Sequence, residues 1–158
     1  MDLMELRRGL LMIMAGQIKN LDNLFANVQM YPGYISGNGS TAAPGETTKE
    51  IYTDYIDTSK WSAGDQIYFL VKYPANNNSM WCSIGVFDEN DSFLSRPTSS
   101  ITTQSQIPVN DGYLLYGVIQ IPLTAKKIKL SCRTYGGELF ACKAQDFSDS
   151  IPFVESNQ

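Results

Sequence analysis

The sequence predicts a mainly β protein, an antiparallel β-sandwich of jelly-roll-like or immunoglobulin-like type preceded by an N-terminal α-helix. Two patterns indicate this fold class. Apolar residues recur every three or four positions near the N-terminus, whereas short alternating apolar and polar runs follow from residue 50 onward. The 158 residues, 43% of them hydrophobic, suffice for one domain with its own core and one appended helix.

Residues 1–30 predict an amphipathic helix with a wide apolar face. Spacings of three and four run from Leu3 to Val28, and a second apolar stripe lies beside this seam. Gly9 and Gly16 each weaken a helix interior by about 1 kcal/mol, so the helix needs a surface to pack on. That surface is the protein's own domain or a larger assembly, and the methionines favour the assembly. The predicted assembly contacts are Leu3, Leu6, Leu10, Leu11, Ile13, Met14, Leu21 and Leu24.

The same segment does not fit an export signal or a membrane anchor. Asp2 and Glu5 lie in the region that a signal peptide keeps basic, and the apolar run over residues 10–15 is short. A membrane span needs about 20 apolar residues in a row, but polar residues follow from Lys19 onward. We therefore expect no membrane span.

The sandwich domain is expected over residues 50–158. Residues 31–49 are rich in Gly, Ser, Thr and Pro and predict a linker or a loosely held first edge. Turn residues then bound each alternating run, which is typical of a sandwich. The predicted strands are residues 50–56, 66–73, 79–87, 93–96, 113–121, 127–135 and 138–143, with residues 150–155 closing a sheet.

Alternation within two of these strands predicts which side chains face the core. The expected core residues are Cys82, Ile84, Val86, Ile128, Leu130 and Cys132. The opposite faces are expected to be solvent-facing and carry Trp81, Ser83, Gly85, Phe87, Lys129, Ser131, Arg133 and Tyr135. Such a face is either a ligand platform or an ordinary outer surface.

The three cysteines predict free, buried thiols, because they form no C-x-x-C pair and are odd in number. If Gly136-Gly137 makes a two-residue hairpin, Cys132 pairs with Ala141 and lies on the opposite face from Cys142. We therefore expect no disulfide between Cys132 and Cys142.

Composition limits the chemistry to carboxylates. The chain has no histidine, which removes the commonest general base and most catalytic zinc sites. Its net charge of −4 does not favour nucleic-acid binding. The run "DENDSF" at residues 88–93 lacks the glycine and the acidic residue of a calcium loop, so a polar turn is expected. We expect no metal, no cofactor and no enzyme activity. A carboxylate pair, Asp54 with Asp57 or Asp65, or Asp146 with Asp149, keeps a glycoside hydrolase as a third hypothesis.

Aromatic residues and loop amides favour carbohydrate recognition, because flat amphipathic rings stack on sugars and amides hydrogen-bond to their hydroxyls. Trp61 lies near a turn and is expected at the rim of a site, whereas Trp81 in mid-strand also fits plain packing. The candidate ligand-binding residues are Trp61, Tyr73, Asn77, Trp81, Arg133 and Tyr135.

Three stretches carry a resemblance to bacteriophage virion proteins. The opening "MELRRGLLMIMAG" resembles the starts of small structural proteins of phages and prophages from Gram-positive hosts. "DYIDTSKWSAGDQIYF" and "VFDENDSFLSR" resemble a β-sandwich module of phage tail and baseplate proteins. The resemblance implies a jelly-roll virion protein, often carbohydrate-binding and often trimeric, assembled in the host cytoplasm. The chain lacks the shaft of a full tail fibre, so a head-fibre or capsid decoration protein remains open.

These observations lead to two main functional hypotheses. In the first, a non-enzymatic virion protein presents its sandwich to a host glycan or receptor and is attached to other virion proteins through its N-terminal segment. In the second, a capsid or tail decoration protein stabilises neighbouring subunits and binds no sugar. A homo-oligomer, with a trimer favoured, is expected in both.

Overall fold

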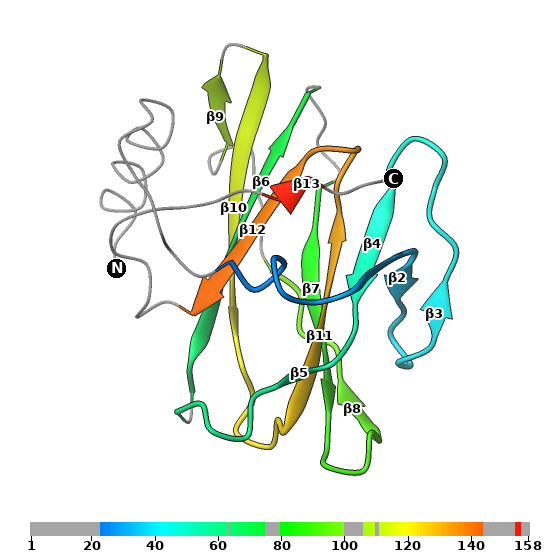
Figure 1. Cartoon of the computed structure of the whole chain (residues 1–158), viewed down its shortest axis with the longest axis vertical. Coiled ribbons are helices and arrows are strands. Elements are labelled where there is room, and N and C mark those ends of the chain that lie inside the picture. The colour runs from blue at the N-terminus through cyan, green and yellow to red at the C-terminus, as the bar shows by residue number, and fades with distance from the viewer. Residues whose placement is uncertain are drawn as a thin grey trace.

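The computed structural model describes residues 23–62, 64–74, 80–99, 106–109, 111–143 and 154–155, which form antiparallel β-structure (Figure 1). No helix occurs among these residues. The strands are β1 (Met30–Pro32), β2 (Tyr34–Ile35), β3 (Thr41–Ala42), β4 (Glu50–Thr53), β5 (Ile56–Asp57), β6 (Gln66–Tyr73), β7 (Cys82–Phe87), β8 (Phe93–Ser95), β9 (Gln106–Val109), β10 (Gly112–Gln120), β11 (Lys127–Arg133), β12 (Glu138–Lys143) and β13 (Val154–Glu155).

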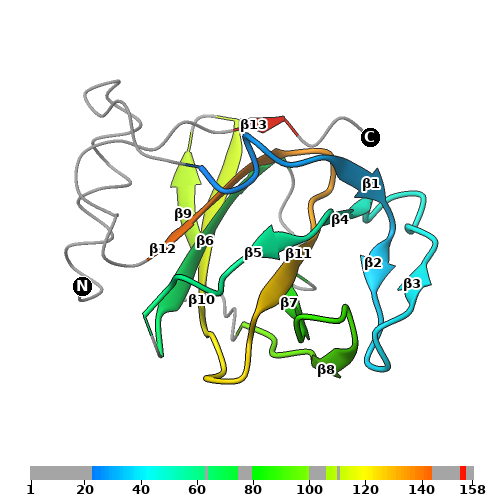
Figure 2. The ribbon, with the colours of Figure 1, turned by 60° about the horizontal axis from the view of Figure 1, so that its bottom comes forward.

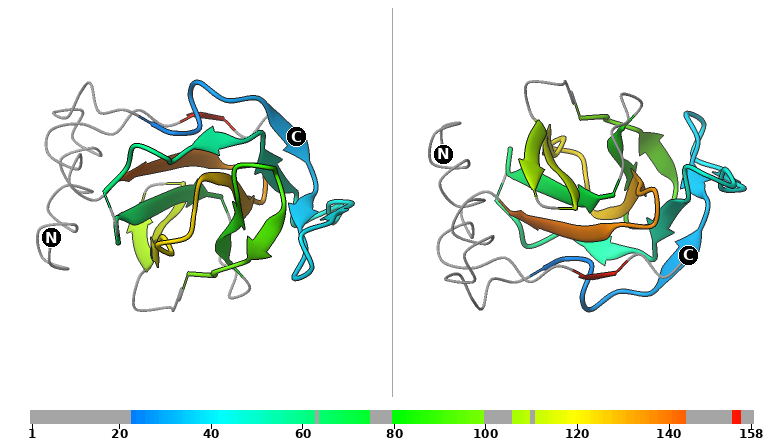
Figure 3. Two further views of the ribbon diagram at one scale, coloured as in Figure 1. Left: turned by 90° about the horizontal axis from the view of Figure 1, so that it is seen from below. Right: turned by 90° about the horizontal axis from the view of Figure 1, so that it is seen from above.

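The strands form two sheets and a separate hairpin. The first sheet has the order β1-β4-β11-β7-β8, with β5 also paired to β11. The second has the order β13-β12-β6-β10-β9, and β2 pairs with β3 alone. The turned view of Figure 2 separates β12, β6 and β10 of the second sheet from β11 and β7 of the first. In the views of Figure 3 the two sheets lie against each other as two layers. The protein is therefore a sandwich-like arrangement of antiparallel sheets.

The connection between β11 and β12 crosses from one sheet to the other, so the two-residue hairpin considered for Gly136-Gly137 does not occur. β11 pairs with β4, β5 and β7, whereas β12 pairs with β6 and β13. Tyr135 and Gly136 both have positive φ, 50° and 78°, and turn the chain sharply. A side chain at Gly137 would collide with the carbonyl oxygen of Lys72. The turn at residues 135–137 thus connects the two layers. The rules for short hairpins assume that consecutive strands pair, so they do not predict this connection.

The core lies between the two sheets, as the alternation predicted. Cys82, Ile84 and Val86 of β7 and Ile128, Leu130 and Cys132 of β11 all belong to it. They face Ile67, Phe69 and Val71 of β6, and Leu115 and Ile119 of β10. Cys82 and Cys132 are opposite each other in the register, and burial together with a hydrogen bond between the two thiols raises the pKa of Cys132.

The outer face of the first sheet is more covered than the sequence predicted. Ser83 and Ser131 lie on that face, yet both are fully buried. The hairpin β2–β3 supplies the cover, because the Ile35 amide donates to Ser131 Oγ at 3.3 Å and the Ile35 side chain is also fully buried. A Cβ atom at Gly85 would lie 3.3 Å from Ile35, so the missing side chain makes room for it. Other side chains of this face, among them Tyr52 and Lys129, are partly exposed.

Residues 31–49, predicted as a linker or loose edge, contain β2, β3 and part of β1. Pro32 of β1 pairs with Ile51 of β4, and β2 packs Ile35 on the first sheet. Gly33 has a φ of 123°, a conformation that favours glycine and lets the chain turn from β1 to β2. The segment is thus built into the sandwich-like structure.

Residues 23–30 form a turn followed by the start of β1, so the predicted helix is wrong over this part. Phe25 is buried in the core and makes an edge contact with Phe69 at 6.3 Å between ring centroids. Leu24, predicted as an assembly contact, packs against the same core. Leu24 and Phe25 continue the apolar pattern of the predicted helix, but they lie in a turn and are apolar because both pack in or against the core. The rest of the predicted helix, with its other assembly residues, lies outside the described residues.

Candidate functional site

An open pocket at one end of the first sheet brings together charged and aromatic side chains. Trp81 precedes β7, Glu50 starts β4, Arg133 ends β11 and Arg96 follows β8. Its volume is about 410 Å³, within the range of small-molecule sites. The lining residues, which we call the Arg–Trp pocket, are Tyr34, Ala43, Pro44, Gly45, Thr48, Glu50, Trp81, Arg96 and Arg133.

The indole of Trp81 orients both arginines. The guanidinium carbon of Arg96 lies 5.1 Å from the ring centroid and that of Arg133 lies 5.8 Å from it. Tyr34 contacts the same ring edge-on at 6.0 Å. Cation–π contacts of this kind hold the flexible arginine side chains in place, which lowers the entropy lost when they bind a ligand. The indole therefore supports the cations, and its contacts with them leave less of its surface for stacking.

Glu50 is a buried carboxylate that balances one of the two arginines. Arg133 Nε donates to Glu50 Oε2 at 2.8 Å, while Gly45 N and Thr48 Oγ1 donate to Oε1 at 2.7 and 2.9 Å. Burial alone raises the pKa of Glu50, but these hydrogen bonds outweigh it and the pKa is lowered. The carboxylate therefore remains ionised and ties the loop at residues 43–48 to the sheet.

Of the two arginines in the pocket, Arg96 is the one without an acidic partner among the described residues. The ion pairs found in that part of the chain are Lys72–Asp111, Lys127–Asp91 and Arg133–Glu50. The Arg96 Nε atom is buried and makes no hydrogen bond there. Two guanidinium groups and one carboxylate give the Arg–Trp pocket a net charge of +1, in a chain whose net charge is −4. The pocket therefore attracts an anionic group.

The predicted site residues separate into different places. Trp81 and Arg133 meet in the Arg–Trp pocket, as their common outer face suggested. Tyr73 is buried in the core, with its ring 6.2 Å from that of Tyr135, so the two tyrosines pack together and neither lines the pocket. Trp61 packs at the edge of the core with Lys143 Nζ 5.3 Å from its ring. Asn77 lies outside the described residues.

The sequence reasoning missed Glu50, Arg96 and Tyr34. Each lies in a different segment of the chain. The order β4-β11-β7-β8 brings Glu50 and Arg96 together, and the hairpin β2–β3, packed on this sheet through Ile35, adds Tyr34. One signal was present, because a glutamate in a run of apolar and aromatic residues predicts a partner for its charge.

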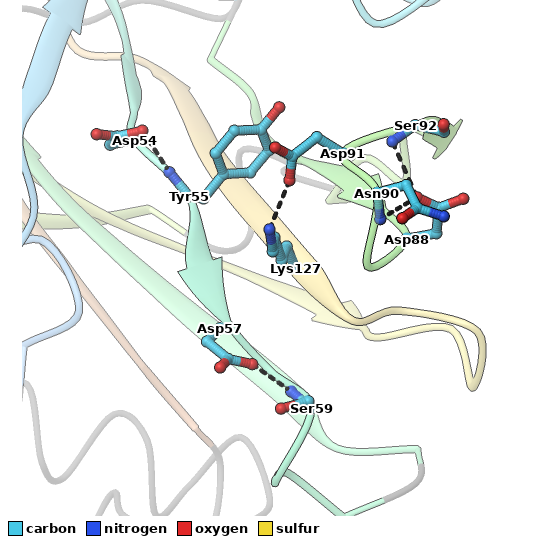
Figure 4. A network of polar contacts seen from close by, with 9 residues as sticks. All are labelled: Asp54, Tyr55, Asp57, Ser59, Asp88, Asn90, Asp91, Ser92 and Lys127. Carbon is cyan, nitrogen blue, oxygen red and sulfur yellow. Dashed lines mark hydrogen bonds and ion pairs between the residues drawn. The ribbon is translucent and has the colours of Figure 1, made fainter.

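Figure 4 shows a second polar cluster at the other end of the first sheet, around the turn between β7 and β8. Asp88 Oδ1 accepts hydrogen bonds from the amides of Asn90 and Ser92 at 2.8 and 2.9 Å, so residues 88–93 form the predicted polar turn. Asp91, with a φ of 65°, pairs with Lys127 at 2.6 Å. No group of three metal-ligating side chains occurs in the part of the chain that the structure describes.

The carboxylates considered for catalysis cap local turns. Asp54 accepts from the amide of Tyr55, Asp57 from that of Ser59, and Asp65 from that of Ser62, all at 2.9 to 3.0 Å. Figure 4 shows Asp54 just before β5 and Asp57 at the end of β5. Asp146 and Asp149 lie outside the described residues. The local hydrogen bonds account for the positions of the three described aspartates without a catalytic role.

Among the described residues there is no helix long and apolar enough to span a membrane. Comparisons with protein-family models, curated proteins and solved structures gave no match. The candidate site is therefore identified from its geometry alone.

Proposed function

We propose that the protein is a non-enzymatic phage virion protein that binds a host glycan in the Arg–Trp pocket. The observation that carries this proposal is Arg96, a cation held against Trp81 with no acidic partner among the described residues. Guanidinium groups bind carboxylate and phosphate oxygens through two parallel hydrogen bonds. The expected ligand is therefore a saccharide that carries a carboxylate or a phosphate.

The setting in a virion rests on the resemblance of the opening segment and of residues 54–69 and 86–96. The chain passes from the first sheet to the second and back through β4, β6, β7, β10, β11 and β12, which supports a jelly-roll-like sandwich. Attachment to other virion proteins through residues 1–30, and a trimeric state, belong to the same proposal.

One observation favours a second function, that of a decoration protein without a sugar ligand. β1 is an edge strand of the first sheet, and Tyr31 on it is 38% exposed while stacked on Tyr52 at 5.3 Å. An edge strand with an exposed aromatic residue can pair with a neighbouring subunit. In this function the Arg–Trp pocket binds an acidic side chain of that subunit.

A glycan array that pairs each acidic saccharide with its neutral counterpart tests the first function. We expect the full-length protein to bind the acidic saccharides. Arg96→Gln should weaken this binding at least about tenfold, because it removes a charge-assisted hydrogen bond. Trp61→Ala changes an aromatic residue outside the pocket and serves as the matched control.

Thermal unfolding of each variant shows that the fold is kept. If the folded, assembled wild type binds no saccharide, the glycan proposal fails and the decoration function is favoured. Binding that survives Arg96→Gln but is lost in Trp61→Ala would place the glycan site away from the Arg–Trp pocket.

A further inference from the structure

The outer face of the second sheet is apolar along three adjacent strands. The register aligns Phe140 with Leu70 and Tyr116 in one row, and Cys142 with Tyr68 and Val118 in the next. Leu114 continues the face beside Lys72. We call these side chains the second outer face: Tyr68, Leu70, Leu114, Tyr116, Val118, Phe140 and Cys142. A face of this composition is unstable in water and needs a cover.

The second outer face is in fact buried at its centre. Leu70 and Phe140 are 0% exposed, Leu114 and Cys142 are 1% exposed, and Tyr68 is 4% exposed. The first sheet packs on the opposite side, and the hairpin β2–β3 packs on the first sheet. Neither the first sheet nor this hairpin therefore covers the second outer face.

The described chain begins at the edge of this face. Asn23 Nδ2 donates to the carbonyl of Leu139 at 2.9 Å, and its Oδ1 accepts from the amide of Ala141 at 3.1 Å. The amide of Leu24 donates to the carbonyl of Ala141 at 2.8 Å. Phe140 and Cys142, the two neighbours of Ala141, point to the second outer face. Residues 1–22 therefore join the described chain next to β12, at the edge of the second outer face.

Residues 1–22 have the right length and pattern to cover it. As a helix they would extend about 33 Å, against about 26 Å for the eight residues of β6. Their apolar arc spans about half of the helix circumference, more than one sheet face uses. The alternative segment, residues 144–153, has only ten residues, and Gln145, Asp146 and Asp149 are among them.

We propose that residues 1–22 form a helix that docks on the second outer face of its own chain. The stripe of Leu3, Leu6, Leu10 and Ile13 meets Leu70, Tyr116 and Phe140, while the stripe of Met4, Leu11, Met14 and Ile18 is left for a partner. Docking within one chain is favoured over docking on a second copy, because Asn23 tethers the helix directly at the edge of the face. A short tether gives an effective concentration in the millimolar range.

The native thiols provide the test in the full-length protein. Cys142 lies on the second outer face, whereas Cys82 and Cys132 are buried in the core and report whether the fold is intact. We expect N-ethylmaleimide, followed by peptide mass mapping, to label Cys142 at least about tenfold faster in Leu6→Glu/Leu10→Glu than in the wild type, because buried charge opens the contact. Met4→Glu/Leu11→Glu adds the same charges to the other stripe and should leave Cys142 protected.

Equal protection of Cys142 in both double variants would overturn the proposal. A second measurement needs no variant: the labelling rate of wild-type Cys142 should stay constant over an about hundredfold dilution if the cover belongs to the same chain. A rate that rises on dilution would mean that a second copy supplies the cover, and would overturn the proposal even if the charged variants unfold. Neither arm depends on glycan binding.

Discussion

The outer faces of the two sheets carry different kinds of side chain, although both are built from antiparallel strands. The first sheet presents Lys127, Lys129 and Arg133 from β11, and their charges rest on aromatic rings. The second sheet presents Leu70 from β6 and Phe140 from β12, and both are fully buried. Charged and aromatic side chains at a margin suit reversible contacts in water, whereas a continuous apolar face suits permanent cover. The comparison therefore separates a partly exposed face of charged and aromatic side chains from an apolar face that is buried at its centre.

The largest expected effect is at the second outer face. Phe140→Ala should lower the free energy of unfolding by about 3–5 kcal/mol, because it opens a cavity under the covered face. Urea denaturation measures the loss. Tyr52→Ala, on the partly exposed outer face of the first sheet, is the matched control and should lose less than half as much. A loss below about 1 kcal/mol for Phe140→Ala would mean that this face is not covered in solution.

A smaller, pH-dependent effect is expected at Glu50. Its pKa is lowered in the folded protein, so the stability it contributes is present above the ordinary value of about 4.3 and lost as the pH falls through the folded value. Glu50→Gln should therefore be less stable than the wild type at pH 7 by about 1–2 kcal/mol. The expected loss is modest because Arg133 is 26% exposed and solvent screens the ion pair. Thermal melts at pH 7 and pH 3 test it. The difference between wild type and variant should shrink at pH 3, and a difference that grows there would contradict the assignment.

The smallest effect is expected at Lys129, whose ammonium lies 4.3 Å from the ring centroid of Tyr55. Lys129→Gln removes cation–π contacts at a partly exposed site and should cost about 0.5–1 kcal/mol. Lys126→Gln, an exposed lysine on the preceding turn, is the control and should be neutral. Parallel urea titrations compare the two variants. A loss for Lys129→Gln as large as that for Phe140→Ala would erase the distinction between the two outer faces.

Much of the β-structure could be predicted, because local periodicity specifies a strand and its two faces. The boundaries of β6 and β12 match the predicted residues 66–73 and 138–143. The short strands β1, β2 and β3 were missed, because their residues are turn formers and pair only through the register with β4 or with each other. The apolar run at residues 67–71 was a signal for burial on both faces, which the sequence reasoning did not use.

The sequence by itself determined that the protein is mainly β, and which side chains of β7 and β11 face the core, since a period of two residues leaves no other choice. Only the tertiary structure decided which sheet each strand joins and which distant residues share a site. Trp81 and Arg133 were recognisable as candidates, but Glu50 and Arg96 joined them through the strand order of the first sheet. Strand pairing depends on contacts across the whole chain, and local spacing contains little information about them.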